Sequence, residues 1–456
     1  MQRAITSQLD AYRTPLISMA VLVGFTLALF GVQRVGMPIW TLMIPVIGAA
    51  YLLITLQKPM IGLVAVICVF FVPIRLDIGV SLLQTVGGGT AALLMVWFLY
   101  TKRGLVFGKI QAPLLLLGVM ILVSIWFSMD ATRTTFYFRR WVFNMMFVML
   151  MLNLVTTFDV FKKIIWSVMI MAAVNSIAGV IGYASASEHN YRSTGLMENA
   201  NSFGHLAALA FPLALYQYIY RRGWMRVAGF ALLIILTGGI VASVSRGALL
   251  SVMVVFAVTL WRERQRAIPL LIVVAVAVAA TPLLPEYYQD RVGNLAVDIK
   301  NSVMVNNDRG LTSRGYLNSA GLKIWSTHPI LGVGIGNFGY YYVQREFVED
   351  LAGSEQTIAH NIYIQALAEM GVVGAFLLLW IMLQSAKSIL RARKLSEAYQ
   401  DRLVYFRAIE MMALAILVST ATYGSLMNND FWMFIGLTAI ASRVAADQPE
   451  PMAKPA

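Results

Sequence analysis

The chain has 456 residues, of which 59% are hydrophobic and only 12% are charged. A soluble globular protein would lack the polar surface needed to cover such an apolar interior, so the composition excludes that class and indicates a polytopic membrane protein. The net charge of +13 does not indicate a nucleic-acid-binding protein, because the basic residues lie in short loops between apolar runs. The single cysteine, Cys68, lies inside an apolar run and cannot form an internal disulfide.

The apolar runs predict an all-α polytopic membrane protein with about 12 to 14 transmembrane helices and one long outer loop. The first run is followed by a short loop and a second run, so we interpret it as a retained span rather than a cleaved signal peptide. The predicted spans lie near 15–32, 38–55, 60–74, 81–100, 112–128, 141–156, 163–183, 204–220, 226–243, 247–261, 267–283, 361–385, 405–423 and 431–445.

Alternate loops carry lysine and arginine, for example Lys162 with Lys163 and Arg221 with Arg222. Short loops rich in these residues stay in the cytoplasm, so both termini are predicted to be cytoplasmic. The sequence then divides into four predicted parts. They are an N-terminal transmembrane bundle of about 11 helices (1–283), a long outer loop with amphipathic helices (284–360), C-terminal transmembrane helices (361–445) and a cytoplasmic tail (446–456).

Under this topology the polar residues of the chain gather on the outer side of the membrane, which in a Gram-negative cell is the periplasm. Chemistry on that side has no access to ATP or nucleotide sugars, so the donor would be carried by a lipid. The residues placed there include His189, His205, His328, His360, Arg192, Arg246 and Arg314.

Two outer segments carry polar residues ahead of predicted helices. Residues 129–140 form one loop, whose arginines we expect to reach toward lipid phosphates. The second segment, residues 184–205, carries Arg192, Asn199 and Asn201 just before an apolar helix. Asparagine and serine are favourable helix N-caps, so a structural role explains much of the second pattern.

Two arginines in outer turns have two interpretations each. Arg246 lies near the hydrocarbon boundary, where a permanent positive charge needs a partner. Lipid headgroups are one such partner, and the diphosphate of a polyprenyl-linked sugar is the other, because a planar guanidinium can bind two phosphate oxygens at once. Arg314 is either a diphosphate ligand or a solvated loop charge. It precedes an amphipathic stretch, 316–325, which predicts a helix on the membrane surface.

Gly332, Gly334 and Gly336 do not predict a nucleotide-binding loop, because that fingerprint needs a preceding strand, a following helix and a cytosolic nucleotide. We expect these glycines to permit a tight turn or a close approach of the backbone.

A polar loop turns into an apolar helix at His360 and Asn361, and we expect His360 to open that helix. The helix N-terminus favours a neutral imidazole, which is the form that a general base requires. The alternative is that His360 is a polar cap at the membrane interface. Gly371 and Gly374 lie on one face of the same helix, which is predicted to press against a neighbouring element.

Glu369 is the clearest intramembrane carboxylate. It lies roughly 13 Å deeper than His360 along the helix axis, so we expect it to pair with another polar group inside the bundle. The four histidines lack the spacing typical of paired metal ligands, and no metal site is predicted.

Several stretches together resemble the signature of the O-antigen ligase and polymerase superfamily of membrane glycosyltransferases. The resemblance covers roughly residues 190–385. It is carried by His360-Asn361 with Gly371 and Gly374, by Ser313-Arg314 with Trp325, Pro329 and the run 331–338, by Ser245-Arg246-Gly247-Ala248, and by the Gly-Leu-x-x-Asn-x-Asn run ending at Asn201.

The resemblance implies a GT-C-like enzyme of the bacterial inner membrane with its active site on the periplasmic face. A glycan on undecaprenyl diphosphate would enter from the outer leaflet. Arg246 and Arg314 would bind its diphosphate, and His360 would deprotonate the attacking hydroxyl in an inverting displacement that needs no metal, nucleotide or other cofactor. The predicted substrate-binding residues are Arg192, Asn199, Asn201 and Asn361.

The resemblance leaves two candidate acceptors for the glycan. A ligase passes the glycan to the lipid A core, whereas a polymerase passes it to another lipid-linked repeat of O-antigen or exopolysaccharide. A third member type transfers glycans to protein. From another class, a polysaccharide exporter or flippase would show internal repeats and broken helices, and the sequence has no clear repeat.

Overall fold

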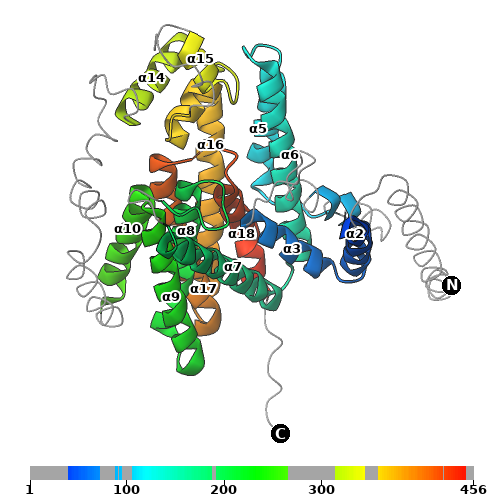
Figure 1. The fold of residues 1–456 in the computed structure, drawn as a ribbon, viewed down its shortest axis with the longest axis vertical. Helices are drawn as coiled ribbons and strands as arrows, with labels where there is room; N and C mark the ends of the chain where they lie inside the picture. The colour runs from blue at the N-terminus through cyan, green and yellow to red at the C-terminus, as the bar shows by residue number, and fades with distance from the viewer. Residues whose placement is uncertain are drawn as a thin grey trace, which may run out of the picture.

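The computed structural model describes residues 40–71, 88–90, 92–94, 105–186, 192–264, 314–344, 358–424 and 426–447. These residues form α-helices, with no β-strand among them, which confirms the predicted all-α class (Figure 1). Four of the described helices are long and apolar enough to cross a membrane, so the protein is a polytopic membrane protein. They are α7 (Phe158–Ala184), α9 (Gly223–Ser243), α16 (Ile362–Leu395) and α17 (Gln400–Thr422).

The other described helices overlap further predicted spans or belong to the predicted outer loop. Predicted spans 15–32 and 267–283 lie outside the described residues, as does most of 81–100. The remaining helices are α2 (Trp40–Gln57), α3 (Pro59–Phe71), α5 (Gln111–Ser124), α6 (Ala131–Leu154), α8 (Ala200–Tyr220), α10 (Arg246–Arg262), α14 (Arg314–Thr327), α15 (Phe338–Gln344) and α18 (Asn429–Ala446).

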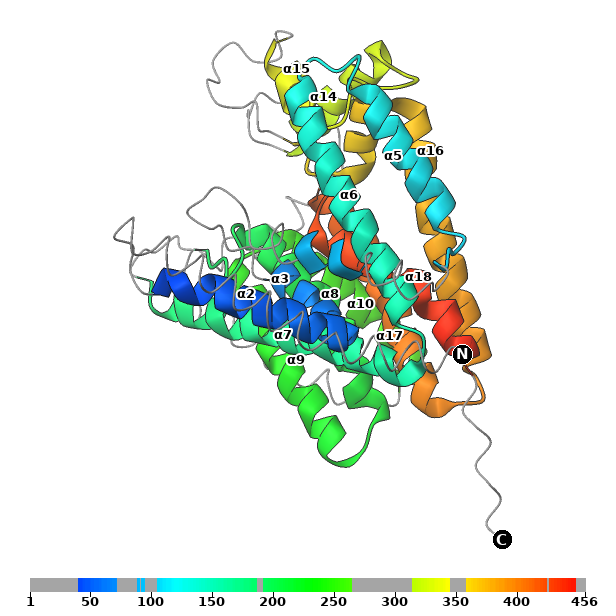
Figure 2. The ribbon, with the colours of Figure 1, turned by 90° about the vertical axis from the view of Figure 1, so that its right-hand side faces the viewer.

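Helix α8 lies at the centre of the bundle and is buried along most of its length. Small residues allow this close packing. A Cβ atom added to Gly204 of α8 would lie 2.5 Å from Ser243 Oγ of α9, and one added to Gly239 of α9 would lie 2.4 Å from Ser176 Oγ of α7. Figure 2 shows α14 and α15 beside one end of α16, the end where that helix begins.

The bundle has two ends with different side chains. The first, which we call the histidine end, contains His205, His360 and Tyr423, where α8, α10, α16 and α18 begin and α9 and α17 end. The other, which we call the ion-pair end, contains the salt bridges between Arg262, Arg393 and Glu410. Arg221, from one of the basic loops that set the predicted orientation, lies at the ion-pair end, where it pairs with Asp401 in the first turn of α17.

The prediction of an outer loop at residues 129–140 is wrong, because α6 begins at Ala131. Asp130 is the N-cap of this helix, and its carboxylate accepts a 3.0 Å hydrogen bond from Arg133 N. Arg140 does not extend toward lipid phosphates, since its Nη2 donates to the carbonyl of Met427 at 2.9 Å. Helix α6 therefore begins ten residues before the predicted span at 141–156, and the arginines expected to precede the span lie within the helix.

Helix α16 is broken at Gly371, whose backbone angles are φ 61° and ψ −161°. In an unbroken helix the carbonyls of Ala368 and Glu369 would accept from the N–H groups of residues 372 and 373. Instead these carbonyls accept from Val333 N at 3.1 Å and Gly334 N at 2.9 Å.

Val333 and Gly334 belong to the loop between α14 and α15, residues 328–337, which we call the glycine loop. The two N–H groups that the break releases also bond to this loop. Val372 N donates to Pro329 O at 2.9 Å, and Val373 N donates to Ile330 O at 3.3 Å. These four backbone groups are therefore satisfied within the protein, as non-helical backbone in a membrane protein requires. The predicted close neighbour of the helix at Gly371 is therefore this loop, since a Cβ atom added to Gly371 would lie 2.2 Å from Ile330 O.

Gly332, Gly334 and Gly336 each have a positive φ, and each lies close to a different part of the chain. An added Cβ would lie 2.3 Å from the backbone of Glu369 at Gly332, 2.5 Å from Ser128 at Gly334 and 2.5 Å from Tyr137 at Gly336. Their φ angles are 68°, 92° and 81°. The expectation of tight turns and close backbone approach is confirmed.

Candidate active site

His360 precedes α16 and does not open it, because the helix begins at Ile362 and Asn361 is its N-cap. The side-chain oxygen of Asn361 accepts from Tyr363 N at 3.0 Å and from Ile364 N at 3.3 Å. His360 is in the left-handed region with φ 55°, a conformation that is unfavourable for a residue with a Cβ atom. The chain thus fixes the imidazole just outside the positive end of the helix.

The imidazole of His360 stacks on Tyr423, with ring centroids 6.0 Å apart and planes 25° apart. The same tyrosine ring stacks on His205 at 5.1 Å, with planes only 3° apart. His205 is buried in α8, and Tyr423 follows the last residue of α17. Three segments far apart in the sequence therefore meet in one group of parallel rings.

Arg246 is the first residue of α10 and lies at the histidine end. The next residue, Gly247, packs on the stack, because an added Cβ there would lie 2.9 Å from His205 Cε1 and 2.4 Å from Thr422 Oγ1. The turn before Arg246 contains Val244 in the left-handed region with φ 50°. Val244 and His360 are the non-glycine residues with positive φ in the described part of the chain. Val244 lies two residues before Arg246, and His360 is itself a predicted catalytic residue.

Arg192 joins the start of α8 to the end of α9. Its Nε donates to Ser243 O at 3.2 Å, and its Nη2 donates to the side-chain oxygen of Asn201 at 2.7 Å. Asn199 is the N-cap of α8 and accepts from Asn201 N at 2.8 Å. The predicted substrate-binding residues Arg192, Asn199 and Asn201 therefore lie together, and part of their hydrogen bonding holds the local backbone.

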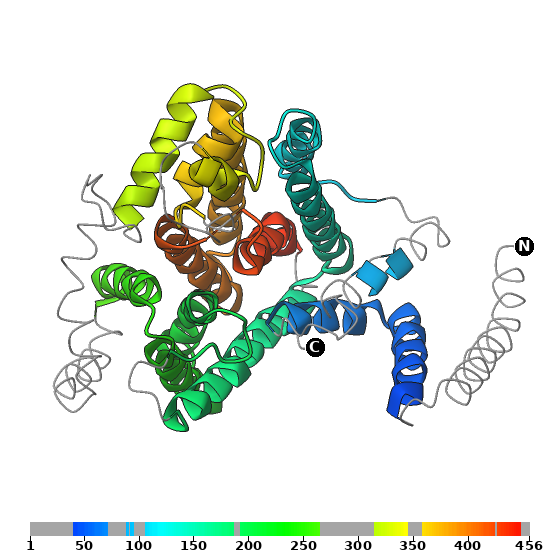
Figure 3. The same ribbon diagram turned by 45° about the horizontal axis from the view of Figure 1, so that its top comes forward.

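Arg314 is the first residue of α14, a helix that packs on the first turn of α16. The contact is close at Gly321, where an added Cβ would lie 2.4 Å from Ile364 Cγ2. Leu317 and Ile324 pack in the same cluster as Ala359. Arg314 precedes Gly321 by seven residues, so its Cα atom lies about 10 Å along the axis of α14 from this contact. Figures 1 and 3 show α14 and α10 on the same side of α16.

Glu369 is buried and is hydrogen-bonded to its own surroundings, as expected for an intramembrane carboxylate. Its Oε1 accepts from Phe338 N and from Gln365 Nε2, both at 3.2 Å. It therefore holds the end of the glycine loop against the first half of α16.

Sequence reasoning missed Tyr423 and the two serines that hold it. The Tyr423 hydroxyl lies 2.7 Å from Ser202 Oγ, and Ser419 Oγ lies 2.8 Å from His205 Nδ1. The polar run Ser419-Thr420-Ala421-Thr422-Tyr423 at the end of an apolar span is the signal that could have identified this segment.

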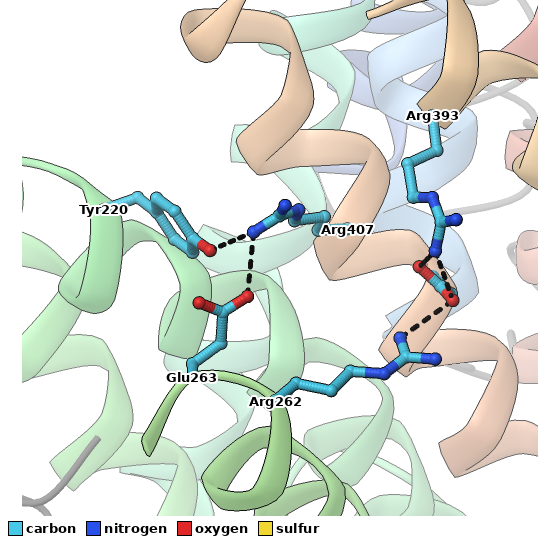
Figure 4. A network of polar contacts seen from close by, with 6 residues as sticks. Tyr220, Arg262, Glu263, Arg393 and Arg407 are labelled. Atoms are coloured by element: carbon cyan, nitrogen blue, oxygen red, sulfur yellow. Dashed lines mark hydrogen bonds and ion pairs between the residues drawn. The ribbon is translucent and has the colours of Figure 1, made fainter. Parts of the chain in front are cut away.

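A polar cavity of about 700 Å³ lies at the ion-pair end, away from the histidines. Figure 4 shows three arginines there: Arg262 and Arg393 contact the carboxylate of Glu410. The third, Arg407, contacts the carboxylate of Glu263, the residue that follows α10. None of the predicted catalytic or substrate-binding residues lines this cavity. Its lining residues are Tyr216, Trp261, Arg262, Glu263, Arg393, Glu397, Leu403, Arg407 and Glu410.

The fold and the gathered polar residues define a polytopic membrane protein with a candidate site where its helices begin and end on one side. Residues 231–379 match the family model described as O-antigen ligase. This part of the chain is therefore similar to the O-antigen ligase family, which confirms the resemblance inferred from the motifs. The matched region includes Arg246, Arg314 and His360. A search of curated proteins gave no match.

Proposed function

We propose that the protein transfers a glycan from undecaprenyl diphosphate to a hydroxyl group of the lipid A core. The observation that carries this proposal is the family match, because it spans the three residues expected to perform the reaction. The position of Arg246 and His360 at one end of the bundle supports it. No metal or other cofactor enters the proposed reaction, since the lipid diphosphate is already an activated leaving group.

In the proposed reaction, His360 takes the proton from the acceptor hydroxyl while the oxygen attacks the anomeric carbon. The bond from that carbon to the diphosphate oxygen breaks, and its electron pair leaves with the lipid diphosphate. Arg246 and Arg314 stabilise the charge that develops on the diphosphate. Attack from the face opposite the leaving group inverts the anomeric carbon.

Arg192, Asn199, Asn201 and Asn361 bind the sugar or the diphosphate in this proposal. The hydrogen bonds described above occupy the side-chain oxygens of the three asparagines and two nitrogens of Arg192, and they hold the first turns of α8 and α16 and the end of α9. An asparagine cap accepts backbone N–H groups through its oxygen, which leaves its NH2 group to donate to a substrate oxygen.

The second candidate is a polymerase that joins lipid-linked repeats, because the family match supports both a ligase and a polymerase type of function. The same residues would act, and only the acceptor would differ. A deletion strain separates the two: free long polymer on the carrier lipid indicates a lost ligase, and accumulated single repeats indicate a lost polymerase.

The proposed orientation places the histidine end in the periplasm and the ion-pair end, both termini and the C-terminal tail in the cytoplasm of a bacterial inner membrane. It rests on the alternation of basic loops along the sequence, of which the one with Arg221 lies at the ion-pair end. Labelling of single cysteines by a membrane-impermeant reagent in intact spheroplasts tests it. A cysteine at position 330 should react and one at position 391 should not.

The activity test is transfer from a defined undecaprenyl-diphosphate oligosaccharide to lipid A core or to a lipid-linked acceptor in proteoliposomes. His360→Ala should lower the transfer rate at least ~100-fold, the usual effect of losing a general base. Arg246→Ala and Arg314→Ala, made separately, should each lower it ~100-fold. Arg391→Ala is the matched control, because this arginine is exposed at the ion-pair end.

Normal transfer by His360→Ala would overturn the base assignment. Movement of labelled donor across the liposome membrane without a new glycosidic bond would instead support an exporter.

A further inference from the structure

The ring of Tyr423 contacts imidazoles from two other segments, and all three rings are nearly parallel. Its centroid lies 6.0 Å from that of His360 and 5.1 Å from that of His205. These separations are within the range of favourable aromatic contacts. The stack joins the residue before α16 to the end of α17 and to α8.

The tyrosine ring is held firmly. Its backbone N–H donates to Ser419 O at 2.8 Å, and its hydroxyl lies 2.7 Å from Ser202 Oγ. The hydroxyl of the same Ser419 lies 2.8 Å from His205 Nδ1. Tyr423 and His205 are therefore fixed to one turn of α17, and their ring planes differ by only 3°.

His360 needs such a support more than a helical residue would. It lies outside α16, in the left-handed region, one residue before the N-cap Asn361. The backbone alone leaves an imidazole free to rotate about two side-chain bonds. A flat aromatic surface against one face of the ring restricts that rotation.

We infer that Tyr423 is a positioning residue for His360: its ring face holds the imidazole in the orientation from which it accepts the acceptor proton. This inference rests on the proposed function, in which His360 is the general base. We assign this effect to the ring of Tyr423, whose face stacks on the imidazole, while its hydroxyl lies 2.7 Å from Ser202 Oγ. A base displaced by 1 Å can lose about 100-fold in rate, so the effect is measurable.

The first test does not depend on glycan transfer. Diethyl pyrocarbonate modifies accessible imidazoles, and mass spectrometry gives the modification rate of His360 relative to exposed His328 in the same sample. Tyr423→Leu should raise this ratio about 3-fold to 10-fold, the factor that corresponds to one aromatic contact. Tyr423→Phe should leave it within about 2-fold of wild type.

Tyr405→Leu is the matched control, because Tyr405 is an equally buried tyrosine of α17 at the ion-pair end. Its ratio should not change. If Tyr423→Leu cannot be purified as a monodisperse protein, Tyr423→Met replaces it, since methionine also removes the aromatic face but fills more of the space of the ring. An unchanged ratio in the variant used overturns the inference.

The second test measures kinetics. Tyr423→Leu should lower kcat about 10-fold to 100-fold and leave the donor KM within about 3-fold, whereas Tyr423→Phe should restore kcat. A Phe variant as slow as the Leu variant would contradict the role of the ring face. Normal transfer by His360→Ala would remove the proposed base, and the modification ratio would still decide whether Tyr423 orients His360.

Discussion

The two ends of the bundle hold their polar side chains by different means. At the ion-pair end, arginines from α10 and α16 share the carboxylate of Glu410, and Arg407 of α17 contacts Glu263 (Figure 4). At the histidine end, Arg140 and Arg192 donate to backbone carbonyls of other segments. Arg262, Arg393 and Arg407 thus contact carboxylates, whereas Arg140 and Arg192 donate to neutral backbone carbonyls.

In the proposed function, this difference separates a structural end from the end that performs the reaction. Ion pairs between helix ends need only opposite charges at suitable positions, and they contribute little each when partly exposed. The histidine end instead contains strained backbone at Val244 and His360 and a helix break at Gly371. Such strain persists where surrounding contacts impose it, and it is frequent at ligand and catalytic sites.

The largest effect is expected where the glycine loop enters the break in α16. Gly332→Ala would place a Cβ atom 2.3 Å from the backbone of Glu369, at a residue whose φ is 68°. Neither backbone can move aside easily, so we expect a loss of ~3 kcal/mol or more in stability. Size-exclusion chromatography and thermal melting in detergent measure it.

The control is Gly48→Ala in α2, because an added Cβ there meets nothing within 4 Å. This variant should keep the wild-type Tm. Equal melting temperatures for Gly332→Ala and Gly48→Ala would mean that the loop does not occupy the break.

Glu369 should rank second. Glu369→Leu leaves the buried Phe338 N–H without its carboxylate acceptor and is expected to cost about 1–3 kcal/mol. Glu369→Gln keeps an oxygen at the same position and should lose clearly less. Thermal melting of the two variants side by side decides, and a Gln variant less stable than the Leu variant would show that the negative charge itself is required.

These glycine and glutamate contacts mark the limit of sequence reasoning here. The helical class and the tight turns at Gly332, Gly334 and Gly336 were predictable, because apolar run length and glycine spacing are local signals. The break at Gly371 was not. A glycine on a helix face is compatible both with a continuous helix that packs closely on a neighbour and with a helix that breaks at the glycine. Which of the two forms depends on a loop some forty residues earlier in the chain.

The same limit explains the partial prediction of the site. His360 and Arg246 stand out because a charged or titratable residue near an apolar span is unusual. Tyr423 does not, since tyrosine at the end of a span is also the ordinary membrane-interface residue. Its contacts with His205 and His360 depend on how α8, α16 and α17 pack.

At the ion-pair end, Glu410→Gln should cost only about 1 kcal/mol, because the Arg262 and Arg393 side chains it serves are 37% and 36% exposed. Salt should reduce the difference from wild type by screening the pairs. The rate of glycan transfer at 25 °C should stay at the wild-type value. A rate loss of ten-fold or more would contradict the separation of the two ends.

The smallest change in stability is expected at Asn361, and it sharpens the comparison most. Asn361→Ala removes the acceptor of Tyr363 N and Ile364 N and should cost about 1 kcal/mol. Asn361→Asp keeps that acceptor and suits the positive helix end, so its Tm should equal that of wild type. Transfer by Asn361→Asp should nevertheless fall, because the NH2 group that would donate to the substrate is replaced by a negatively charged oxygen. Normal transfer by the Asp variant would show that Asn361 acts as a cap alone, and that the substrate contacts of this end come from His360 and the arginines without it.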